Sequence, residues 1–353
     1  MKISIICPIY NGGEFLGQCL DSVILQKHQD WELIAINDGS TDDSEQILKS
    51  YAKRESRISF FSIANHGVAY ARNYGITKAK GEYCFFLDCD DMLPEDSLEF
   101  LNAIAEKTGA DMVSGEPVHF TNTPKYCQKE AVVFEYSGEC EIYENVIFDI
   151  GELKPFNRKS EKRKINNGMW GCLYKTQVIH NHNINFLGTK TGEDLYFSVK
   201  FFMYCQKVVM TSKCTYYFRV NPHSVTHSYI NGYFDDVLEC YIQFKKLYNE
   251  FPSDYEERAK EGLNAWHYYR CRLAVERELT YCLGFKQMKL NLKRIAKNEE
   301  FRKMYFQRKK LGIEESTTHW MKTALFCVMH KMISLPILMS HIYHFYCKVR
   351  KIK

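Results

Sequence analysis

Short apolar runs alternate with longer amphipathic stretches along the first hundred residues. The runs at residues 3–7, 31–36, 58–62 and 83–87 are rich in Ile and Phe, which is typical of buried strands. Between them, residues 14–26, 42–53 and 68–79 space their apolar side chains three to four positions apart, as helices with one buried face do. This alternation predicts βαβ units and an α/β fold with a mostly parallel sheet flanked by helices.

Turn-forming and polar residues follow each predicted strand, at residues 8–11, 37–42, 65–67 and 88–91. The carboxyl ends of parallel strands meet at one edge of a sheet, where such folds bind ligands, so we expect these loops to lie together. Helix N-termini at that edge would face an anion. In the second loop, Ser40 and Asp43 resemble a capping box, which predicts a helix that begins near Thr41 or Asp42.

Three acids, Asp88, Asp90 and Asp91, come directly after the fourth apolar run. Carboxylates this close repel one another and raise each other's pKa unless a cation lies between them. Hard oxygen ligands of this kind suit Mn²⁺ or Mg²⁺. The acidic group therefore predicts a divalent metal that carries phosphates.

The chain changes character beyond about residue 110. Residues 111–228 are mixed, with strand-like pieces at 112–114 and 214–219. Residues 154–164 contain six Lys or Arg and one Glu, which predicts an exposed, mobile loop that is either simply solvated or a lid over the site. Beyond residue 231, the spacing of apolar residues predicts helices at 233–248, 255–283, 285–297 and 299–310.

The last segment, residues 321–353, mixes apolar and aromatic residues and ends in a basic cluster. Its longest uncharged run, at 332–346, is shorter than the ~20 residues of a membrane-spanning helix and contains Pro336. We expect this basic amphipathic tail to lie on an anionic membrane surface. The alternative is a C-terminal helix that packs on the protein's own core.

Composition narrows the class of protein. With 353 residues and 45% hydrophobic composition, the chain can build a large core. A net charge of only +4 and the absence of a nucleic-acid-binding signature argue against nucleic acid as a partner. The 14 cysteines are scattered, and Cys7 and Cys89 are interpreted as small buried residues. Because Pro8 interrupts the N-terminal run where a signal peptide needs its apolar region, we expect a cytoplasmic protein with reduced thiols.

Five short motifs follow one another along the chain, at residues 8–11 (Pro-Ile-Tyr-Asn), 37–42 (Asn-Asp-Gly-Ser-Thr-Asp), 71–73 (Ala-Arg-Asn), 87–91 (Leu-Asp-Cys-Asp-Asp) and 192–194 (Gly-Glu-Asp). Together they resemble the motifs of the family 2 glycosyltransferases, which have the GT-A (Rossmann-like) fold. The resemblance covers roughly residues 1–228. It implies a nucleotide-sugar-binding half at 1–110 and an acceptor-binding half of the same domain at 111–230, followed by the helical region at 231–320 and the tail at 321–353.

The resemblance implies a role for each residue of the donor site. Pro8 and Tyr10 would form the wall against the base and ribose, and Asp38 would accept from the uracil imide N–H. Arg72 would reach the uracil or the phosphates, unless it is an ordinary solvated helix residue.

For the three acids, the resemblance implies an Asp-x-Asp motif. Asp90 would be the direct metal ligand and Asp88 would bind the ribose or sugar hydroxyls beside the metal. Asp91 would be a second ligand or a helix cap. The metal would neutralise the charge that develops as the sugar–phosphate bond breaks.

On the acceptor side, Asp194 matches the position of the family's catalytic base, and its neighbour Glu193 is the residue that could replace it. A helix-capping role stays open for both acids. Trp170 resembles a residue that lines the acceptor site, or else it is a core anchor. Arg219 and His223 would contact the diphosphate, or belong to a strand and a turn.

The function implied is metal-dependent, inverting transfer of a sugar from a nucleotide-sugar, UDP-linked in most family members, to a hydroxyl of a glycan acceptor. The expected acceptor is lipid-linked, in bacterial surface polysaccharide synthesis at the inner face of the cytoplasmic membrane. Two alternatives stay open. One is a non-catalytic nucleotide- or glycan-binding module. The other is a sugar nucleotidyltransferase, which would need a basic residue in the loop after the first strand, where this chain has none before Lys27.

Overall fold

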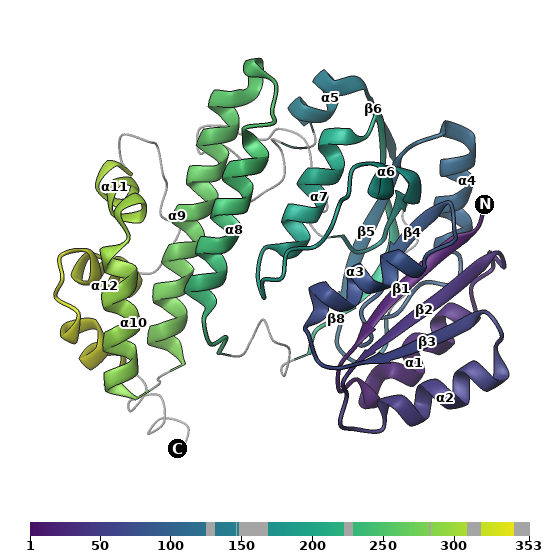
Figure 1. The fold of residues 1–353 in the computed structure, drawn as a ribbon, viewed down its shortest axis with the longest axis horizontal. Coiled ribbons are helices and arrows are strands. Elements are labelled where there is room, and N and C mark those ends of the chain that lie inside the picture. The colour runs from purple at the N-terminus through teal and green to yellow at the C-terminus, as the bar shows by residue number, and fades with distance from the viewer. Residues whose placement is uncertain are drawn as a thin grey trace. The chain divides into compact units, whose positions relative to one another are not determined.

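The computed structural model describes residues 1–124, 131–145, 147, 169–221, 229–281, 284–308 and 319–341. These residues form two compact units, of which the first ends near residue 222 and contains all the described strands (Figure 1). The second unit is helical. The basic segment at 154–164, predicted to be an exposed loop or lid, lies outside the described residues.

An eight-stranded sheet forms the centre of the first unit, in the order β3-β2-β1-β4-β7-β5-β8-β6. The strands are β1 (Ile3–Ile9), β2 (Trp31–Asp38), β3 (Ile58–Ile63), β4 (Tyr83–Phe86), β5 (Met112–Phe120), β6 (Val133–Ser137), β7 (Cys172–Lys175) and β8 (Lys207–Arg219). Strands β1 to β4 are parallel, as predicted. By contrast, β7 runs antiparallel to both β4 and β5, and β6 runs antiparallel to β8.

Helices cover both faces of this sheet (Figure 1). They are α1 (Gly13–Ile24), α2 (Ser44–Arg54), α3 (Val68–Lys78), α4 (Ser97–Thr108), α5 (Gly138–Asn145), α6 (Thr176–Asn181) and α7 (Glu193–Tyr204). Successive side chains of β1 point to opposite faces of the sheet, as they do in any strand. Ile3 and Ile5 join the core formed with α1, α2 and α4, whereas Ile6 lies against Gly75 of α3, where a Cβ atom would come within 2.5 Å of Ile6 Cγ2.

An aromatic cluster fixes α7 and the loop before it to β4. The ring of Phe86 lies 5.3 Å from that of Phe197 and 5.1 Å from that of Phe186, and Phe186 stacks on Phe197 at 4.2 Å. Aromatic pairs at these separations are favourable in both edge-on and stacked arrangements. The N-terminus of α7 is therefore anchored close to the end of β4.

The start of α2 differs from the prediction. The helix begins at Ser44, and Ser40 Oγ accepts a hydrogen bond from the backbone N–H of Asn11 (3.0 Å), not from its own helix. The predicted capping box is therefore wrong, because Ser40 links two loops instead. At the start of the helix itself, Oδ1 of Asp42 accepts a hydrogen bond from the N–H of Ser44 (3.1 Å).

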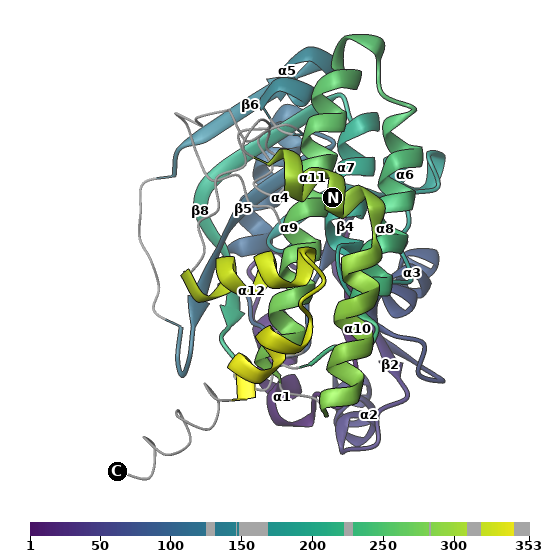
Figure 2. The ribbon, with the colours of Figure 1, turned by 90° about the vertical axis from the view of Figure 1, so that its left-hand side faces the viewer.

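The second unit consists of α8 (Tyr233–Tyr248), η3 (Ser253–Tyr255), α9 (Glu256–Thr280), α10 (Phe285–Lys297), α11 (Glu299–Gln307) and α12 (His319–Met329). Helices α10 to α12 lie on one side of α9 and α8 lies on the other (Figures 1 and 2). Met321, Leu325 and Val328 of α12 are buried in this unit's core, which is the packed alternative left open for the start of the tail. Residues 342–353 lie outside the described residues. Within the described part of the chain, no helix has the length and apolar character needed to cross a membrane.

Candidate active site

Hydrogen bonds join the first two loops at the carboxyl edge of the sheet. The side-chain oxygen of Asn11 accepts from the N–H of Thr41 (2.8 Å), and Asp42 Oδ2 accepts from the N–H of Gly13 (2.8 Å). Together with the bond from Asn11 N–H to Ser40, these contacts hold the loop after β1 against the loop after β2. The expected gathering of loops is thus observed.

Asp38, predicted to bind uracil, also organises the third loop. It is buried, and its two oxygens accept from the backbone N–H groups of His66 and Gly67, each at 2.8 Å. A carboxylate has about four lone-pair sites, so it retains capacity for a further donor. The next residue, Gly39, has a φ of +71°, and a Cβ atom there would lie 2.9 Å from the backbone nitrogen of Asn65, so only glycine fits this turn.

The two residues predicted to form the wall of the base pocket differ in accessibility. Tyr10 is 54% exposed and its ring is available for stacking. Pro8 is buried in β1, in register with Ile36 of β2. Tyr10 is therefore the one of the two whose side chain a base can cover.

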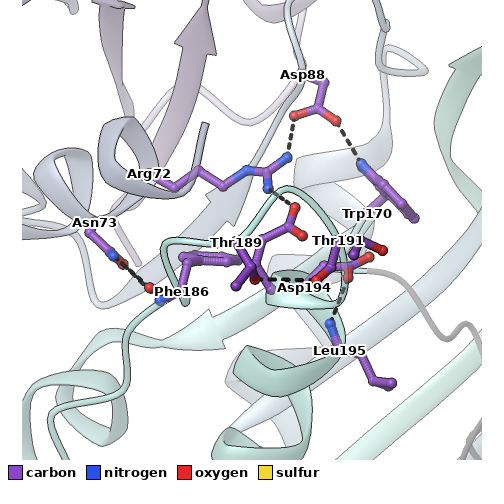
Figure 3. A network of polar contacts seen from close by, with 10 residues as sticks. Arg72, Asn73, Asp88, Trp170, Phe186, Thr189, Thr191, Asp194 and Leu195 are labelled. Carbon is purple, nitrogen blue, oxygen red and sulfur yellow. Dashed lines mark hydrogen bonds and ion pairs between the residues drawn. The ribbon is translucent and has the colours of Figure 1, made fainter. Parts of the chain in front are cut away.

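Asp88 receives a donor on each carboxylate oxygen (Figure 3). Nη2 of Arg72 lies 2.8 Å from Oδ1, and Nε1 of Trp170 donates to Oδ2 at 2.9 Å. Arg72 is buried, not solvated, and its pairing with Asp88 brings α3 onto the acidic loop. Charge-assisted hydrogen bonds of this type orient a carboxylate strongly.

Arg72 also reaches the start of α7. Its Nη1 atom lies 3.4 Å from Oε1 of Glu193. Burial and the adjacent charge of Asp194 raise the pKa of Glu193 to about 7, which the charge of Arg72 opposes. Asp194, in the first turn of the same helix, accepts from the N–H of Leu195 through Oδ1 (2.8 Å; Figure 3). Arg72 therefore connects the acid after β4 with Glu193, the first of the two acids that begin α7.

Asp91 lies beneath the site, held by β8. It is 2% exposed, and its oxygens accept from the hydroxyl of Tyr216 and from the backbone N–H of Arg219, both at 2.7 Å. Burial and the charges of Asp88 and Asp90 raise its pKa to about 8. Both oxygens thus serve contacts inside the protein.

Asp90 is the third acid of the group. Burial and the charge of Asp88 raise its pKa, so a bound cation would stabilise its charged form. Its backbone carbonyl accepts from Nε of Arg219 (2.6 Å), whose Nη2 donates to the side chain of Gln18 (2.8 Å). Arg219, predicted to touch the diphosphate or lie in a strand, is the last residue of β8 and braces this loop.

The carboxylate oxygens of this loop suit a hard divalent cation. In the part of the chain that the structure describes, no group of three His, Cys, Asp or Glu residues forms a complete metal cage. Mg²⁺ and similar ions are commonly held by one or two carboxylates together with substrate phosphates, so a full protein cage is not required. Asp90 offers the carboxylate, with Asp88 beside it.

Trp170 meets Asp88 because of the direction of β7. It precedes β7, which is antiparallel to β4, so the residues just before β7 lie beside those just after β4. Its ring also packs edge-on against Phe218 at 5.3 Å. The side chain is therefore both packed and part of the polar network.

Two supporting contacts were missed by sequence reasoning. Tyr216 donates to Asp91 and accepts from the N–H of Asp88 (3.1 Å), but nothing in the strand sequence distinguishes it from its aromatic neighbours. Asn73 exchanges two hydrogen bonds with the backbone of Phe186, at 2.9 and 2.8 Å; its signal was its place in the Ala-Arg-Asn motif. His223 lies outside the described residues.

The thiols near the site are packed and protonated. Ten cysteines of the described residues, Cys7 and Cys89 among them, are free. A hydrogen bond with Cys19, followed by burial, raises the pKa of Cys7, and burial raises that of Cys89. A protonated thiol is a weak nucleophile, which agrees with the interpretation of both as space-filling residues.

Comparison with known proteins places this chain in a family. The model of Glycosyl transferase family 2 matches residues 4–163. Glycosyltransferase GlyA of Streptococcus pneumoniae is 30% identical over 233 residues, which are 64% of this chain and 31% of GlyA. The uncharacterized glycosyltransferase EpsJ of Bacillus subtilis is 29% identical over 76% of this chain and 75% of its own length. The chain thus spans about a third of GlyA and three quarters of EpsJ.

Solved structures agree on the fold. S. aureus TarS 1-349 in complex with UDP superposes with a TM-score of 0.64 at 18% identity, covering 98% of this chain and 91% of that one. The TarS complex with UDP-GlcNAc gives 0.63 at 19% identity, covering 89% and 88%. Residues 4–163 therefore belong to the family 2 glycosyltransferases by their match to the family model, and the chain has the GT-A fold.

Proposed function

We propose that this protein transfers a sugar from a UDP-sugar to a hydroxyl of a glycan acceptor, with inversion at the anomeric carbon and with the help of Mn²⁺ or Mg²⁺. The observation that carries the proposal is the Arg72 bridge, which connects Asp88 at the end of β4 with Glu193 at the start of α7. A donor held at Asp88 would then lie close to the acids that can deprotonate an acceptor.

For the donor, Tyr10 would stack on the base and Asp38 would accept from the uracil imide. The exposure of Tyr10 and the spare acceptor capacity of Asp38 support this assignment. The TarS complexes with UDP and UDP-GlcNAc, which share the fold, support uridine as the nucleoside. Pro8 would contribute through the backbone of β1, and Asp88 would accept from ribose or sugar hydroxyls while Arg72 and Trp170 hold it in place.

For the metal, Asp90 would be the direct ligand, together with the diphosphate. Asp88 and Asp91 lie beside it in the same loop, and the oxygens of both already accept hydrogen bonds within the protein. A divalent ion in this position supplies Lewis-acid stabilisation of the departing diphosphate. The chain's own part is to hold Asp90 rigidly, which Arg219 does through the Asp90 carbonyl.

For the chemistry, Asp194 would be the base. Glu193 is paired with Arg72, so Asp194 is the acid of the two that is left for the acceptor. It would take the proton of the acceptor hydroxyl as that oxygen bonds to the anomeric carbon and the bond to UDP breaks on the opposite side. A positioned base typically contributes about 10²–10⁴-fold. Trp170 and Glu193 would border the acceptor.

We further propose that the acceptor is lipid-linked and that the reaction belongs to bacterial surface polysaccharide synthesis at the inner face of the cytoplasmic membrane. The family resemblance and the basic, aromatic C-terminal sequence support this assignment. It requires no membrane-spanning helix in this chain.

The test is UDP release from a panel of UDP-sugars by the purified protein, with Mn²⁺ and with EDTA. We expect metal-dependent release that Asp90→Ala abolishes and Asp194→Ala lowers by at least about 10²-fold, while Asp30→Ala at an exposed position leaves it unchanged. A folded protein that neither binds nor hydrolyses any UDP-sugar would refute the donor assignment. Tight binding without transfer to any glycan would favour the binding-module alternative.

A further inference from the structure

Charge is distributed very unevenly along the chain. Residues 285–353 contain sixteen Lys or Arg and four Glu, a net charge of +12, although the whole chain carries only +4. The preceding 284 residues are therefore acidic, at −8. A local excess of this size creates a strong positive field at the C-terminal end, regardless of the modest total.

The same part of the second unit exposes large apolar side chains. Phe306 is 52% exposed, Phe326 46%, Met332 43%, Leu335 46% and Leu338 55%. We call these five residues the apolar patch. Isolated exposed apolar residues are ordinary, but a group of this kind on one region marks an interaction surface.

Contacts show that the patch is continuous at its centre. The ring of His330, just after α12, lies 4.0 Å from that of Phe326 in α12 and 5.6 Å from that of Phe306 in α11, so the three rings form one group. After α12 the chain turns back, since the N–H of Met332 donates to the carbonyl of Cys327 (2.8 Å). Leu335 follows in the next turn, where its N–H donates to the carbonyl of Met332 (3.2 Å).

Basic side chains accompany the patch. The guanidinium of Arg302 lies 5.4 Å from the ring centre of Phe306. Lys322 is exposed one helical turn before Phe326, and Lys331 is exposed in the turn that follows α12. Long basic side chains around an apolar surface are typical of proteins that lie in a membrane interface, with apolar groups in the headgroup region and cations on the phosphates.

We propose that the apolar patch and its surrounding Lys and Arg residues form a docking surface for anionic phospholipids. It is built on α11, α12 and the turn after them, and so includes the described part of the tail at 321–353. The inference rests on the membrane location in the proposed function and names the surface that would provide it, but it is independent of the donor chemistry, because it concerns the second unit only.

The positive charge of this surface favours an anionic membrane over a second copy of this chain as its partner. Two copies of this surface would bring together two regions of like charge, which disfavours a dimer through this face. An anionic lipid surface is complementary, and each basic residue near it strengthens binding about fivefold. In sequence, the chain continues beyond the last described residues with four more cations and no acid, which adds to the same attraction.

The experiment is co-sedimentation of the full chain with vesicles of phosphatidylcholine alone or of phosphatidylcholine with one quarter phosphatidylglycerol. We expect binding to the anionic vesicles only. Salt at about 0.5 M NaCl should weaken this binding, because it screens the attraction between the basic residues and the lipid phosphates. The double variant Lys322→Gln/Lys331→Gln should lower the partition coefficient at least about tenfold. Leu335→Gln/Leu338→Gln should lower it by a similar factor through loss of apolar burial.

Matched controls keep the result specific. Lys49→Gln/Lys53→Gln removes two exposed cations from α2, and Ile242→Gln removes a 47% exposed apolar side chain from α8, so neither should change vesicle binding. Hydrolysis of UDP-sugar in the absence of vesicles should be the same in all variants. Equal binding to neutral vesicles, no binding to anionic ones, or a dimer that the leucine variants dissociate would each overturn the proposal.

Discussion

Nη2 of Arg72 lies 2.8 Å from Oδ1 of Asp88, and the pair is largely shielded from water, with the arginine side chain 5% and the aspartate side chain 24% exposed. The other terminal nitrogen of the same guanidinium faces Glu193. A lysine has one ammonium and cannot span two carboxylates in this way. The planar fork of arginine is thus what holds the acidic loop after β4 and the start of α7 at a fixed separation.

Replacing Arg72 should cost both stability and activity. Arg72→Met leaves two carboxylates without their cation, which we expect to lower the free energy of unfolding by about 3 kcal/mol. Arg72→Lys should retain part of the stability but still reduce UDP release. Urea unfolding and a UDP-sugar hydrolysis assay measure the two effects.

The control for this prediction is Lys49→Ala, which removes an exposed ion pair with Glu45. A surface pair of this kind contributes about 0.5 kcal/mol or less. An Arg72→Met protein as stable as the control would contradict the account of the bridge.

Trp170 should act partly through its N–H group. Trp170→Phe keeps an aromatic ring against Phe218 but removes the donor to Asp88. Loss of one hydrogen bond to a charged group corresponds to about 1.5–3 kcal/mol, so we expect kcat/KM for UDP-sugar hydrolysis to fall roughly 10- to 100-fold. Phe218→Leu, which changes the packing alone, should have the smaller effect. An unchanged rate in Trp170→Phe would show that the hydrogen bond is incidental.

Tyr216 and Asp91 should be energetically coupled. Tyr216→Phe removes the hydroxyl that donates to Asp91, and Asp91→Asn replaces the carboxyl group that accepts from it. A double-mutant cycle of urea unfolding should give an interaction energy of about 1–3 kcal/mol. Tyr70→Phe at a 48% exposed position is the control and should be neutral. Additive effects in the cycle would contradict a direct bond.

Two glycines with a left-handed backbone allow the cost of backbone strain to be measured apart from the cost of steric crowding. Gly39 has a φ of +71° and no space for a Cβ atom, whereas Gly109 has a φ of +65° and nothing within 4 Å. Gly109→Ala should therefore cost only the backbone term of about 1 kcal/mol. Gly39→Ala should cost clearly more and should also weaken UDP binding, as calorimetry can measure. Equal losses of stability would show that the crowding at Asn65 is relieved at no cost.

His267 should make the second unit acid-sensitive. The side chain is fully buried, stacked on Tyr241, and burial lowers its pKa from 6.5 to about 4. The unfolded chain therefore binds a proton at higher pH than the folded chain does, so stability falls as the pH drops from about 6.5 to about 4. The loss attributable to this group is at most about 3 kcal/mol.

Urea midpoints measured across that pH range check the sign. His267→Gln should flatten the slope, whereas His180→Gln at an exposed position should not. The pH limits of 6.5 and about 4 are the pKa values of His267 in the unfolded and the folded chain. The assignment would be contradicted if the wild-type protein became more stable on acidification between these limits and His267→Gln removed that slope.

Periodicity alone predicted the parallel part of the sheet, because β1 to β4 and their helices repeat one simple pattern. It did not predict the reversed strand β7, since a strand of four residues, three of them buried, carries no signal of direction. The acids of the site were found because charge directly after an apolar run is unusual. Their partners were not, because Asp88 meets Arg72, 16 residues away in the sequence, and Trp170, 82 residues away, and spacing alone predicts neither contact.

Ser40 illustrates the same limit at short range. Its spacing to Asp43 suits a capping box, yet the hydroxyl binds Asn11, a residue of the preceding loop. A spacing rule such as the capping box predicts hydrogen bonds between neighbours in the sequence. Where one loop packs against another, the second loop offers other hydrogen-bond partners to the same side chain. The charge asymmetry of residues 285–353 shows the converse, because it is visible in the sequence but hidden in the overall net charge.

The antiparallel pairing of β7 with β4 makes the site sensitive to strand register. Trp170 lies just before the reversed strand, so the alignment of β7 with β4 sets its place beside Asp88. Side chains alternate between the two faces of a sheet, so a slip of one residue would turn the tryptophan to the opposite face. A change in β7 that keeps every polar residue of the network could therefore still remove a donor from Asp88.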